Sequence, residues 1–521
     1  MASTISFTSK GTNLSHVRSG LGSVKEGFET VLKLSIDERP KVRRNAQDFF
    51  EKVFKSLRLA GNARKVSKWR NPNCNGVLPP GSMGFPLIGE TLQLLIPSYS
   101  LDLHPFIKKR IHRYGPIFRS NLAGRPVIVS ADPEFNYYIL SQEGRSVEIW
   151  YLDTFSKLFR QQGESRTNVA GYVHKYLRGA FLSQIGSENL REKLLLHIQD
   201  MVNRTLCSWS NQESVEVKHS ASLAVCDFTA KVLFGYDAEK SPDNLSETFT
   251  RFVEGLISFP LNIPRTAYRQ CLQDRQKALS ILKNVLTDRR NSVENYRGDV
   301  LDLLLNDMGK EKFLTEDFIC LIMLGGLFAS FESISTITTL LLKLFSAHPE
   351  VVQELEAEHE KILVSRHGSD SLSITWDEYK SMTFTHQVIN ETLRLGNVAP
   401  GLLRRAIKDV QFKGYTIPSG WTIMMVTSAQ QVNPEVYKDP LVFNPWRWKD
   451  FDSITVSKNF TPFGGGTRQC VGAEYSRLTL SLFIHLLVTK YRWTKIKEGE
   501  IRRAPMLGFG DGIHFKFSEK E

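Results

Sequence analysis

The distribution of apolar positions along the chain predicts a mainly α fold with a small β portion. From about residue 185 to 400 the apolar residues recur mostly at helical spacing. The most apolar run, residues 321–345, contains Glu332 and several hydroxyl side chains and lies deep within the chain. These features favour a long buried helix, and a membrane span is the alternative.

Strand signals are confined to short stretches before and after this helical region. The turn Ala123-Gly124 separates the first two stretches, and Asp132 is a good N-cap for a helix that follows them. Pro418-Ser419-Gly420 predicts the turn of a later hairpin. The strand stretches are residues 116–122, 125–130, 410–426 and 513–517.

A Pro/Gly-rich breaker at residues 78–90, LPPGSMGFPLIGE, divides the chain into an N-terminal extension, residues 1–77, and a main domain, residues 78–521. The chain carries a net charge of +12, but residues 1–80 hold 15 Lys/Arg against 6 Asp/Glu. Most of the basic excess therefore belongs to the N-terminal part, and we expect no nucleic-acid partner for the main domain. The six cysteines form no CxxC pair, which is typical of a reduced compartment.

One cysteine stands in an unusual local sequence, FGGGTRQCVG at residues 463–472, where a glycine-rich loop enters an apolar helix. The free N–H groups of a first helical turn would face the sulfur of Cys470, so this position predicts a lowered thiol pKa. The alternative is an ordinary buried cysteine beside a turn. Three other stretches bear on the choice: ETLR with Glu391 and Arg394, FNPWRW with Arg447, and Glu332 followed by Ser333.

Taken in order, the acid–alcohol pair, ExxR, FxPxRW and FxxGxRxCxG resemble the motifs of the cytochromes P-450, the haem-thiolate monooxygenases. The last motif is matched in full by Phe463, Gly466, Arg468, Cys470 and Gly472. The resemblance runs from about residue 78 to the C-terminus and implies a single large haem domain. It also implies haem b with Cys470 as axial thiolate, molecular oxygen as co-substrate, and electrons from NADPH delivered by a reductase.

The resemblance further implies roles for residues around the haem. Phe463 would shield the sulfur, the glycines would allow close approach, and four side chains would bind the propionates. His174 takes the place of a commoner tryptophan, and the alternative for it is a surface histidine. The propionate partners are Arg468, His174, Arg178 and Arg404, and the structural triad beneath the haem is Glu391, Arg394 and Arg447.

The family pattern A-G-x-[D/E]-T, which lies on the oxygen side of the haem, aligns with residues 329–333, ASFES. Ser330 replaces glycine and Ser333 replaces threonine. The resemblance implies that Ser333 delivers protons and that Glu332 connects it to water, and serine keeps the hydroxyl that this requires.

Stretches such as PPGSMGFPLIGE and PLNIPRTAYRQC resemble a plant branch of the family that oxidises brassinosteroids, other sterols, triterpenoids and abscisic acid, and above all its eighty-seventh family. The expected substrate is thus an apolar sterol, steroid or triterpenoid, oxidised once or successively. Each expected lining residue could instead be plain core. The expected lining is Phe331, Val398, Ala399, Leu402, Leu403 and Phe509.

Two other functions remain open from the sequence. One is a non-oxygenating haem-thiolate enzyme of the same fold, against which the Glu332–Ser333 pair argues. The other is a catalytically weak or non-enzymatic fusion protein that acts through its N-terminal segment.

The N-terminal extension departs most from the family pattern. Residues 37–54 resemble the second helix of a HEAT-type repeat, which could not bury its apolar face alone. We therefore expect residues 1–77 to be a basic amphipathic extension without a membrane anchor; a transit peptide and a helix on anionic lipid are the alternatives. By resemblance, the expected location is the cytosolic face of the endoplasmic reticulum membrane, with peripheral attachment to the membrane surface.

Overall fold

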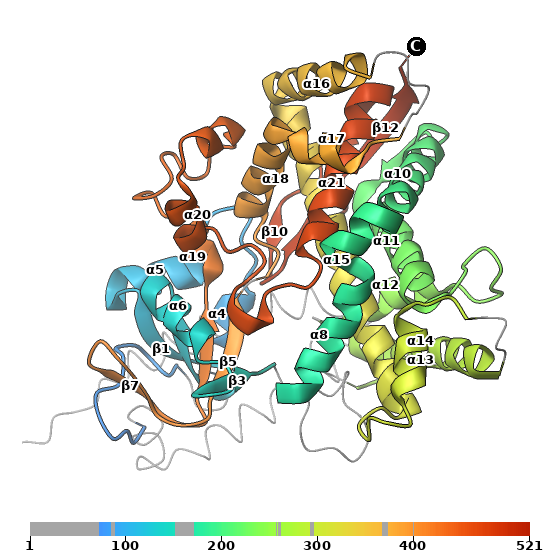
Figure 1. Cartoon of the computed structure of the whole chain (residues 1–521). Helices are drawn as coiled ribbons and strands as arrows, with labels where there is room; N and C mark the ends of the chain where they lie inside the picture. Colours follow the sequence, from blue (N-terminus) through green and yellow to red (C-terminus); the bar gives the residue numbers. More distant parts are fainter. Residues whose placement is uncertain are drawn as a thin grey trace, which may run out of the picture.

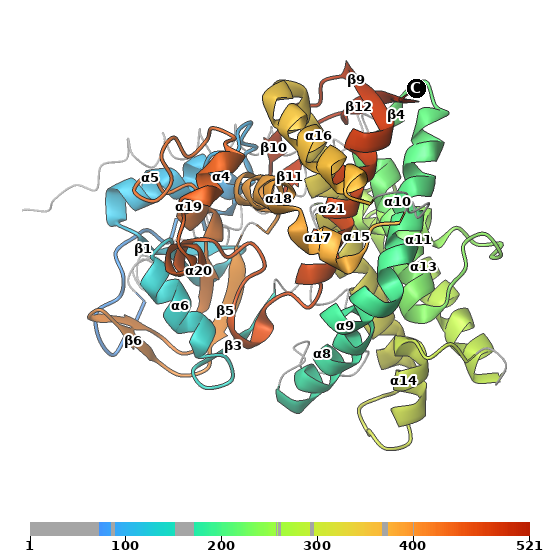
Figure 2. The ribbon, with the colours of Figure 1, turned by 45° about the horizontal axis from the view of Figure 1, so that its top comes forward.

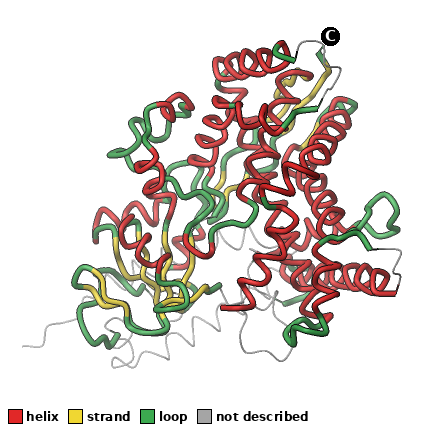
Figure 3. The backbone as a smooth tube through the Cα atoms, in the orientation of Figure 1, coloured by secondary structure: helices red, strands yellow, loops and turns green. Residues whose placement is uncertain are grey.

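Strands gather mainly at one side of the molecule and helices form most of the rest (Figure 1, Figure 3). The computed structural model describes residues 72–84, 89–151, 171–256, 258, 262–291, 296–366, 373–399 and 401–520. The predicted HEAT-like stretch at residues 37–54 lies outside these ranges, as does most of the predicted N-terminal extension.

The largest sheet has five strands in the order β1-β2-β8-β5-β3. β1 and β2 are joined at Ala123 and Gly124, which both have positive φ, as the predicted tight turn requires. β2 and β8 pair in parallel and their paired residues are buried, whereas the other pairs are antiparallel. The sheet therefore joins strands from the two ends of the chain: β1 (Ile117–Leu122), β2 (Arg125–Ser130), β3 (Val147–Ile149), β5 (Leu402–Ala406) and β8 (Thr422–Met425).

The predicted turn at Pro418-Ser419-Gly420 is wrong as a hairpin turn. β6 (Val410–Phe412) instead pairs with β7 (Tyr415–Ile417) through Lys413-Gly414, both with positive φ, in a small separate sheet. A two-residue turn of this kind matches the twist of a hairpin, so it closes before the chain reaches Pro418. The segment after Pro418 then carries β8 into the main sheet.

Three short helices accompany the sheet near the start of the described chain. The last of them begins as predicted at Asp132, whose Oδ1 accepts the Phe135 N–H at 2.8 Å. These helices are α4 (Thr91–Leu95), α5 (Pro105–Tyr114) and α6 (Pro133–Ser141).

The predicted long helix is α15 (Glu316–Ala347), which runs through the middle of the helical part (Figure 1, Figure 2). Among the described helices it is the one long and apolar enough to cross a membrane by length and composition, and more than half of its most apolar window is buried inside the molecule. α11 (Val217–Phe234) and α13 (Ala267–Asn291) pack against it. The other helices that precede it in the chain are α8 (Gly171–Ile185), α9 (Ser187–Asn189), η1 (Leu190–Leu194), α10 (Leu195–Ser210), α12 (Leu245–Leu256) and α14 (Val300–Asp307).

The C-terminal third completes both parts of the fold. Its helices are α16 (Pro349–Val364), α17 (Trp376–Ser381), α18 (Thr383–Gly396), α19 (Thr427–Gln431), η3 (Pro445–Lys449), α20 (Ser453–Asn459), η4 (Gly466–Arg468) and α21 (Ala473–Lys490). Its other strands are β9 (Tyr491–Lys497), β10 (Arg502–Arg503), β11 (Leu507–Gly508) and β12 (His514–Glu519); β12 pairs with β9 and with β4 (Val215–Glu216).

The predicted mainly α fold with a small β portion is therefore confirmed. All six cysteines lie within the described residues and are free.

Candidate active site

A tight loop formed by residues 463–472 presents Cys470 just before α21. The Cys470 N–H donates to the Phe463 carbonyl at 2.9 Å and closes the loop. Gly466 has φ +64°, and a Cβ there would lie 2.7 Å from the carbonyl oxygen of Leu140 on α6. Glycine is therefore required at Gly466 by both backbone conformation and close approach.

The thiol of Cys470 is exposed to solvent and yet has protein on several sides. Desolvation by this surrounding protein raises the thiol pKa. The backbone N–H at Gly472 lowers the pKa, as the sequence argument expected, and so does the Arg178 guanidinium, which it did not anticipate, but the desolvation is larger. The predicted direction is therefore wrong for the protein alone, because the sequence does not show how much protein surrounds the thiol.

One face of the central helix α15 is also open. Gly325, Ala329 and Ser333 are spaced four residues apart and so share a helix face. Ala329 is exposed although α15 is a core helix, and a Cβ at Gly325 would meet no atom within 4 Å. The α15 face that carries the predicted proton donor Ser333 thus borders free space.

Four predicted basic residues come together beside the Cys470 loop from three elements. On α8, Arg178 donates from Nη1 to the Gln469 carbonyl at 2.5 Å. The pKa of His174, one turn earlier on α8, is lowered by desolvation and by the nearby charges of Arg468 and Arg178. Arg404 reaches the group from β5, and its neighbours in turn include Arg468.

A residue that the sequence argument missed joins two of these arginines. The Glu143 carboxylate pairs with Arg404 at 2.7 Å and with Arg468 at 3.1 Å. Glu143 lies in the turn after α6, within no recognisable motif, and is far from both partners in sequence. No sequence signal pointed to it.

The acid of the predicted proton relay also has a partner that was not predicted. Glu332 forms an ion pair with Lys218 of α11 at 2.7 Å between Nζ and Oε1. Both side chains retain some exposure, so the pair is accessible to water. Ser330, which replaces the family glycine, donates its hydroxyl to the Leu327 carbonyl at 3.0 Å.

The predicted triad forms a closed buried network. Arg394 and Glu391 are fully buried and share two hydrogen bonds of 2.8 and 2.9 Å, the bidentate geometry expected for this pair. Arg447 adds a third contact to Glu391 at 3.1 Å. The other donors to this carboxylate are the Trp448 indole at 3.0 Å and the Asn444 N–H at 3.1 Å.

The predicted substrate residues are dispersed. Phe331 and Phe509 are only 1% and 4% exposed and belong to the main hydrophobic core, where Phe331 packs edge-on against Phe249. Ala399 is exposed. Val398, Leu402 and Leu403 are half-buried at the edges of three separate apolar clusters.

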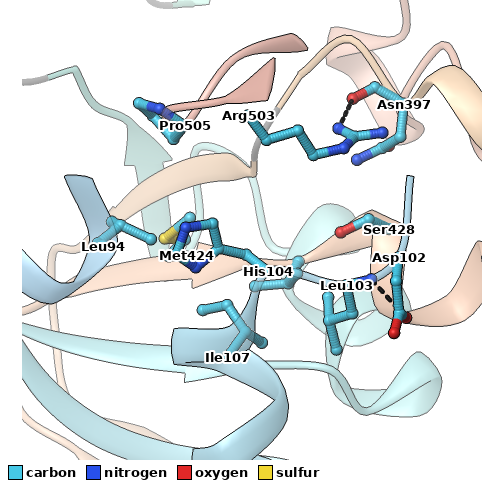
Figure 4. A pocket seen from close by; sticks show the side chains of 11 residues that line it. Leu94, Asp102, Leu103, His104, Ile107, Asn397, Met424, Ser428, Arg503 and Pro505 are labelled. Atoms are coloured by element: carbon cyan, nitrogen blue, oxygen red, sulfur yellow. Dashed lines mark hydrogen bonds between the residues drawn. The ribbon is translucent and has the colours of Figure 1, made fainter. Parts of the chain in front are cut away.

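A separate pocket, with about 400 Å³ of space partly open to solvent, lies between α5, β8 and β10 (Figure 4). None of the predicted site residues lines it. Arg503 runs along its wall and donates to the carbonyls of Leu395, Gly396 and Asn397 at 2.9, 2.7 and 3.2 Å. Burial lowers the Arg503 pKa to about 10. These bonds cap the end of α18 and so hold the backbone just before Val398.

Comparison with protein families identifies two segments. The cytochrome P450 family model matches residues 79–511. A model of RRP12-like N-terminal HEAT repeats matches residues 17–69, the region in which the HEAT-like stretch was expected.

Two curated plant proteins match nearly the full main domain. Cucurbitadienol 11-hydroxylase of Siraitia grosvenorii is 55% identical over 88% of this chain and 96% of its own length. Beta-amyrin 16-alpha-hydroxylase CYP87D16 of Maesa lanceolata is 51% identical over 87% of this chain and 96% of its own length. Among solved structures, retinoic acid-bound cyanobacterial CYP120A1 superposes with a TM-score of 0.74 at 25% identity, covering 86% of this chain and all of that one.

Proposed function

The chain belongs to the cytochrome P450 family, and from this premise we propose that it hydroxylates a triterpenoid or sterol skeleton, with Cys470 as the axial haem ligand. Membership makes the protein a haem-thiolate monooxygenase that receives electrons from NADPH through a reductase. The observation that carries the site assignment is an accessible Cys470 that lies beside converging basic side chains.

The described residues fit a haem. Bound there, it would supply the activation of molecular oxygen, favoured by electron donation from a thiolate. Cys470 would hold the iron, the glycines of the 463–472 loop would permit close approach, and Phe463 would cover the sulfur. The propionates would be bound by His174, Arg178, Arg404 and Arg468.

The triad has a positioning role in this proposal. Arg394 also donates to the carbonyls of Gln431 and Pro440, both at 2.7 Å, and Arg447 to that of Lys438 at 2.6 Å. Glu391 thus ties α18 to the segment that leads into the Cys470 loop. We assign it no chemical step.

Proton delivery would fall to α15. The Ser333 hydroxyl stands on the open helix face and would pass a proton into the free space beside it, while Glu332 would exchange protons with water. Lys218 holds the Glu332 carboxylate at 2.7 Å, so it would decide where that carboxylate points. The presence of the Glu332–Ser333 pair argues against a non-oxygenating enzyme.

The substrate class rests on the relatives, whose names specify cucurbitadienol and beta-amyrin, together with more distant cholesterol hydroxylases. We propose Val398, Ala399, Leu402 and Leu403 as wall residues, with Phe331 and Phe509 supporting that wall from the core. An apolar lining suits a rigid hydrocarbon skeleton.

The location is proposed from family resemblance as the cytosolic face of the endoplasmic reticulum, where the protein would meet its reductase and the membrane surface. Fractionation tests this. Release of the full chain by high salt or carbonate supports peripheral attachment, whereas release by detergent alone contradicts it.

Co-expression with a reductase in yeast that accumulates triterpenes and sterols tests the activity. We expect a product heavier by one oxygen atom that depends on oxygen and NADPH. A carbon monoxide difference spectrum of thiolate type without any oxygen-dependent product from either substrate class would favour the non-oxygenating alternative. Absence of that spectrum in the purified, haem-supplied protein would overturn the site assignment.

A further inference from the structure

Glu143 occupies a well-defined turn beside the Cys470 loop. The Gly144 N–H donates to the Val147 carbonyl at 2.8 Å, and Gly144 has positive φ, so the backbone after Glu143 folds back sharply. The side chain is only 9% exposed. Its Oε1 also accepts the backbone N–H of Ile149 at 3.2 Å, which fixes the carboxylate relative to β3.

Glu143 contacts two arginines, and each arginine uses its Nε atom in the contact. Oε2 lies 2.7 Å from Nε of Arg404, and Oε1 lies 3.1 Å from Nε of Arg468. The Arg468 contact is a hydrogen bond that holds its planar guanidinium by Nε, whereas the Arg404 contact is an ion pair without hydrogen-bond geometry. Arg404 is held in addition by a hydrogen bond from its Nη1 to the Leu403 carbonyl at 2.9 Å. One carboxylate therefore joins two arginines that come from β5 and from the Cys470 loop.

The charges around this cluster also balance in a specific way. Arg178, Arg404 and Arg468 contribute three positive charges and Glu143 one negative charge, which leaves an excess of two. His174 adds no charge at neutral pH, because desolvation lowers its pKa. Two ionised propionates carry the opposite charge, so a net positive cluster of described residues would attract them.

We propose that Glu143 is a positioning residue for the haem: its ion pairs hold Arg404 and Arg468 together beside the Cys470 loop, where they meet the propionates, and its charge sets the net charge of the site. The inference rests on the proposed function, because it assumes that haem binds above Cys470. It adds a residue that neither the motifs nor the comparisons assign.

The neighbouring strand position offers a matched control. Glu148 of β3 forms an ion pair with Arg405 of β5, directly beside Arg404. Side chains alternate between the faces of a sheet, so this pair points to the opposite side. Glu148→Gln therefore removes the same kind of charge from a neighbouring carboxylate–arginine pair without altering the Arg404–Arg468 cluster.

The test compares purified holoproteins of the natural sequence, Glu143→Gln, Glu143→Asp and Glu148→Gln. In Glu143→Gln the uncompensated positive charge should favour the reduced iron. We expect the reduction equilibrium to shift about tenfold, a rise of about 59 mV in midpoint potential for one electron. Haem transfer to excess apomyoglobin should accelerate several-fold. Glu148→Gln should change neither quantity.

Glu143→Asp keeps the charge but withdraws the carboxylate by one methylene, so haem transfer should accelerate while the potential stays near that of the natural sequence. If Glu143→Gln yields no holoprotein, the comparison of Glu143→Asp with Glu148→Gln still tests the inference. Potentials and haem-transfer rates in both Glu143 variants equal to those of Glu148→Gln would overturn the inference. Failure of the natural sequence to bind haem would instead overturn the proposed function.

Discussion

Replacing Glu391 by glutamine should destabilise the protein strongly, because one buried carboxylate accepts five hydrogen bonds. Oε1 accepts from Arg394, Arg447 and Asn444, and Oε2 accepts from Arg394 and Trp448. A glutamine side chain can retain one oxygen. If the oxygen takes the Oε1 position, the amide group faces two donors, Arg394 Nε and the Trp448 indole, and can accept from neither.

The magnitude follows from these contacts. Each lost hydrogen bond to a charged group costs about 1.5–3 kcal/mol. Arg394 and Arg447 also lose their carboxylate counter-charge while 0% and 8% exposed, and breaking a buried ion pair by removing one partner costs about 3–5 kcal/mol. These terms describe the same loss, so we expect about 3–5 kcal/mol in total. Folded proteins are stable by only about 5–15 kcal/mol, so this is a large fraction.

Two measurements on the haem-loaded protein test this prediction. One is the midpoint of thermal unfolding, and the other is the fraction of protein that gives a thiolate-type carbon monoxide spectrum. A domain of about 200 residues loses about 2–4 °C in Tm per kcal/mol, and a larger one loses less, so a drop of several degrees is expected. Glu354→Gln on α16 is the matched control, because Glu354 is exposed and its loss should cost less than about 0.5 kcal/mol. If Glu391→Gln has the same Tm as Glu354→Gln and keeps the thiolate-type carbon monoxide spectrum, the network does not hold the Cys470 loop.

Three further predictions test the chemistry and the fold. Cys470→Ala should lose the thiolate-type carbon monoxide spectrum and all turnover, and retained turnover would contradict the ligand assignment. Ser333→Ala should release more peroxide per NADPH consumed, with little change in substrate affinity, and Ser333→Thr should restore coupling; unchanged peroxide release would place the relay elsewhere. The buried His359 and His485 have pKa values lowered to about 3 and about 4 by desolvation. The unfolded chain, in which histidine has a pKa near 6.5, therefore binds more protons, and stability should fall as pH drops from about 6.5 towards 4. His359→Gln should flatten this dependence of Tm on pH, and an identical slope would show that other groups cause it.

The sequence by itself determined the features that are encoded locally. The periodicity of residues 321–345 identified α15, the Ala123-Gly124 turn located β1 and β2, and the spacing around Cys470 identified the family, which the comparisons confirmed. These predictions succeeded because helix periodicity, turn chemistry and a short motif involve residues that are neighbours in the chain.

Local signals can also compete, and then the sequence does not decide between them. Both Lys413-Gly414 and Pro418-Ser419-Gly420 are compatible with a turn, and the second was predicted. The structure uses the first for the hairpin, because β8 pairs with β2 and β5 in the main sheet and so cannot pair with β6. Pairing across some 300 residues of sequence is settled only when the chain folds.

The electrostatics of the site depended on tertiary structure most of all. The helix-entry position of Cys470 predicted a lowered pKa, but protein packed around the thiol raises it in the chain alone. Glu143 lies 325 residues before Arg468 and belongs to no motif, yet it contacts both Arg404 and Arg468. Desolvation and ion pairing depend on which atoms lie within a few ångströms, and for residues so far apart in the chain only the folded structure fixes that distance.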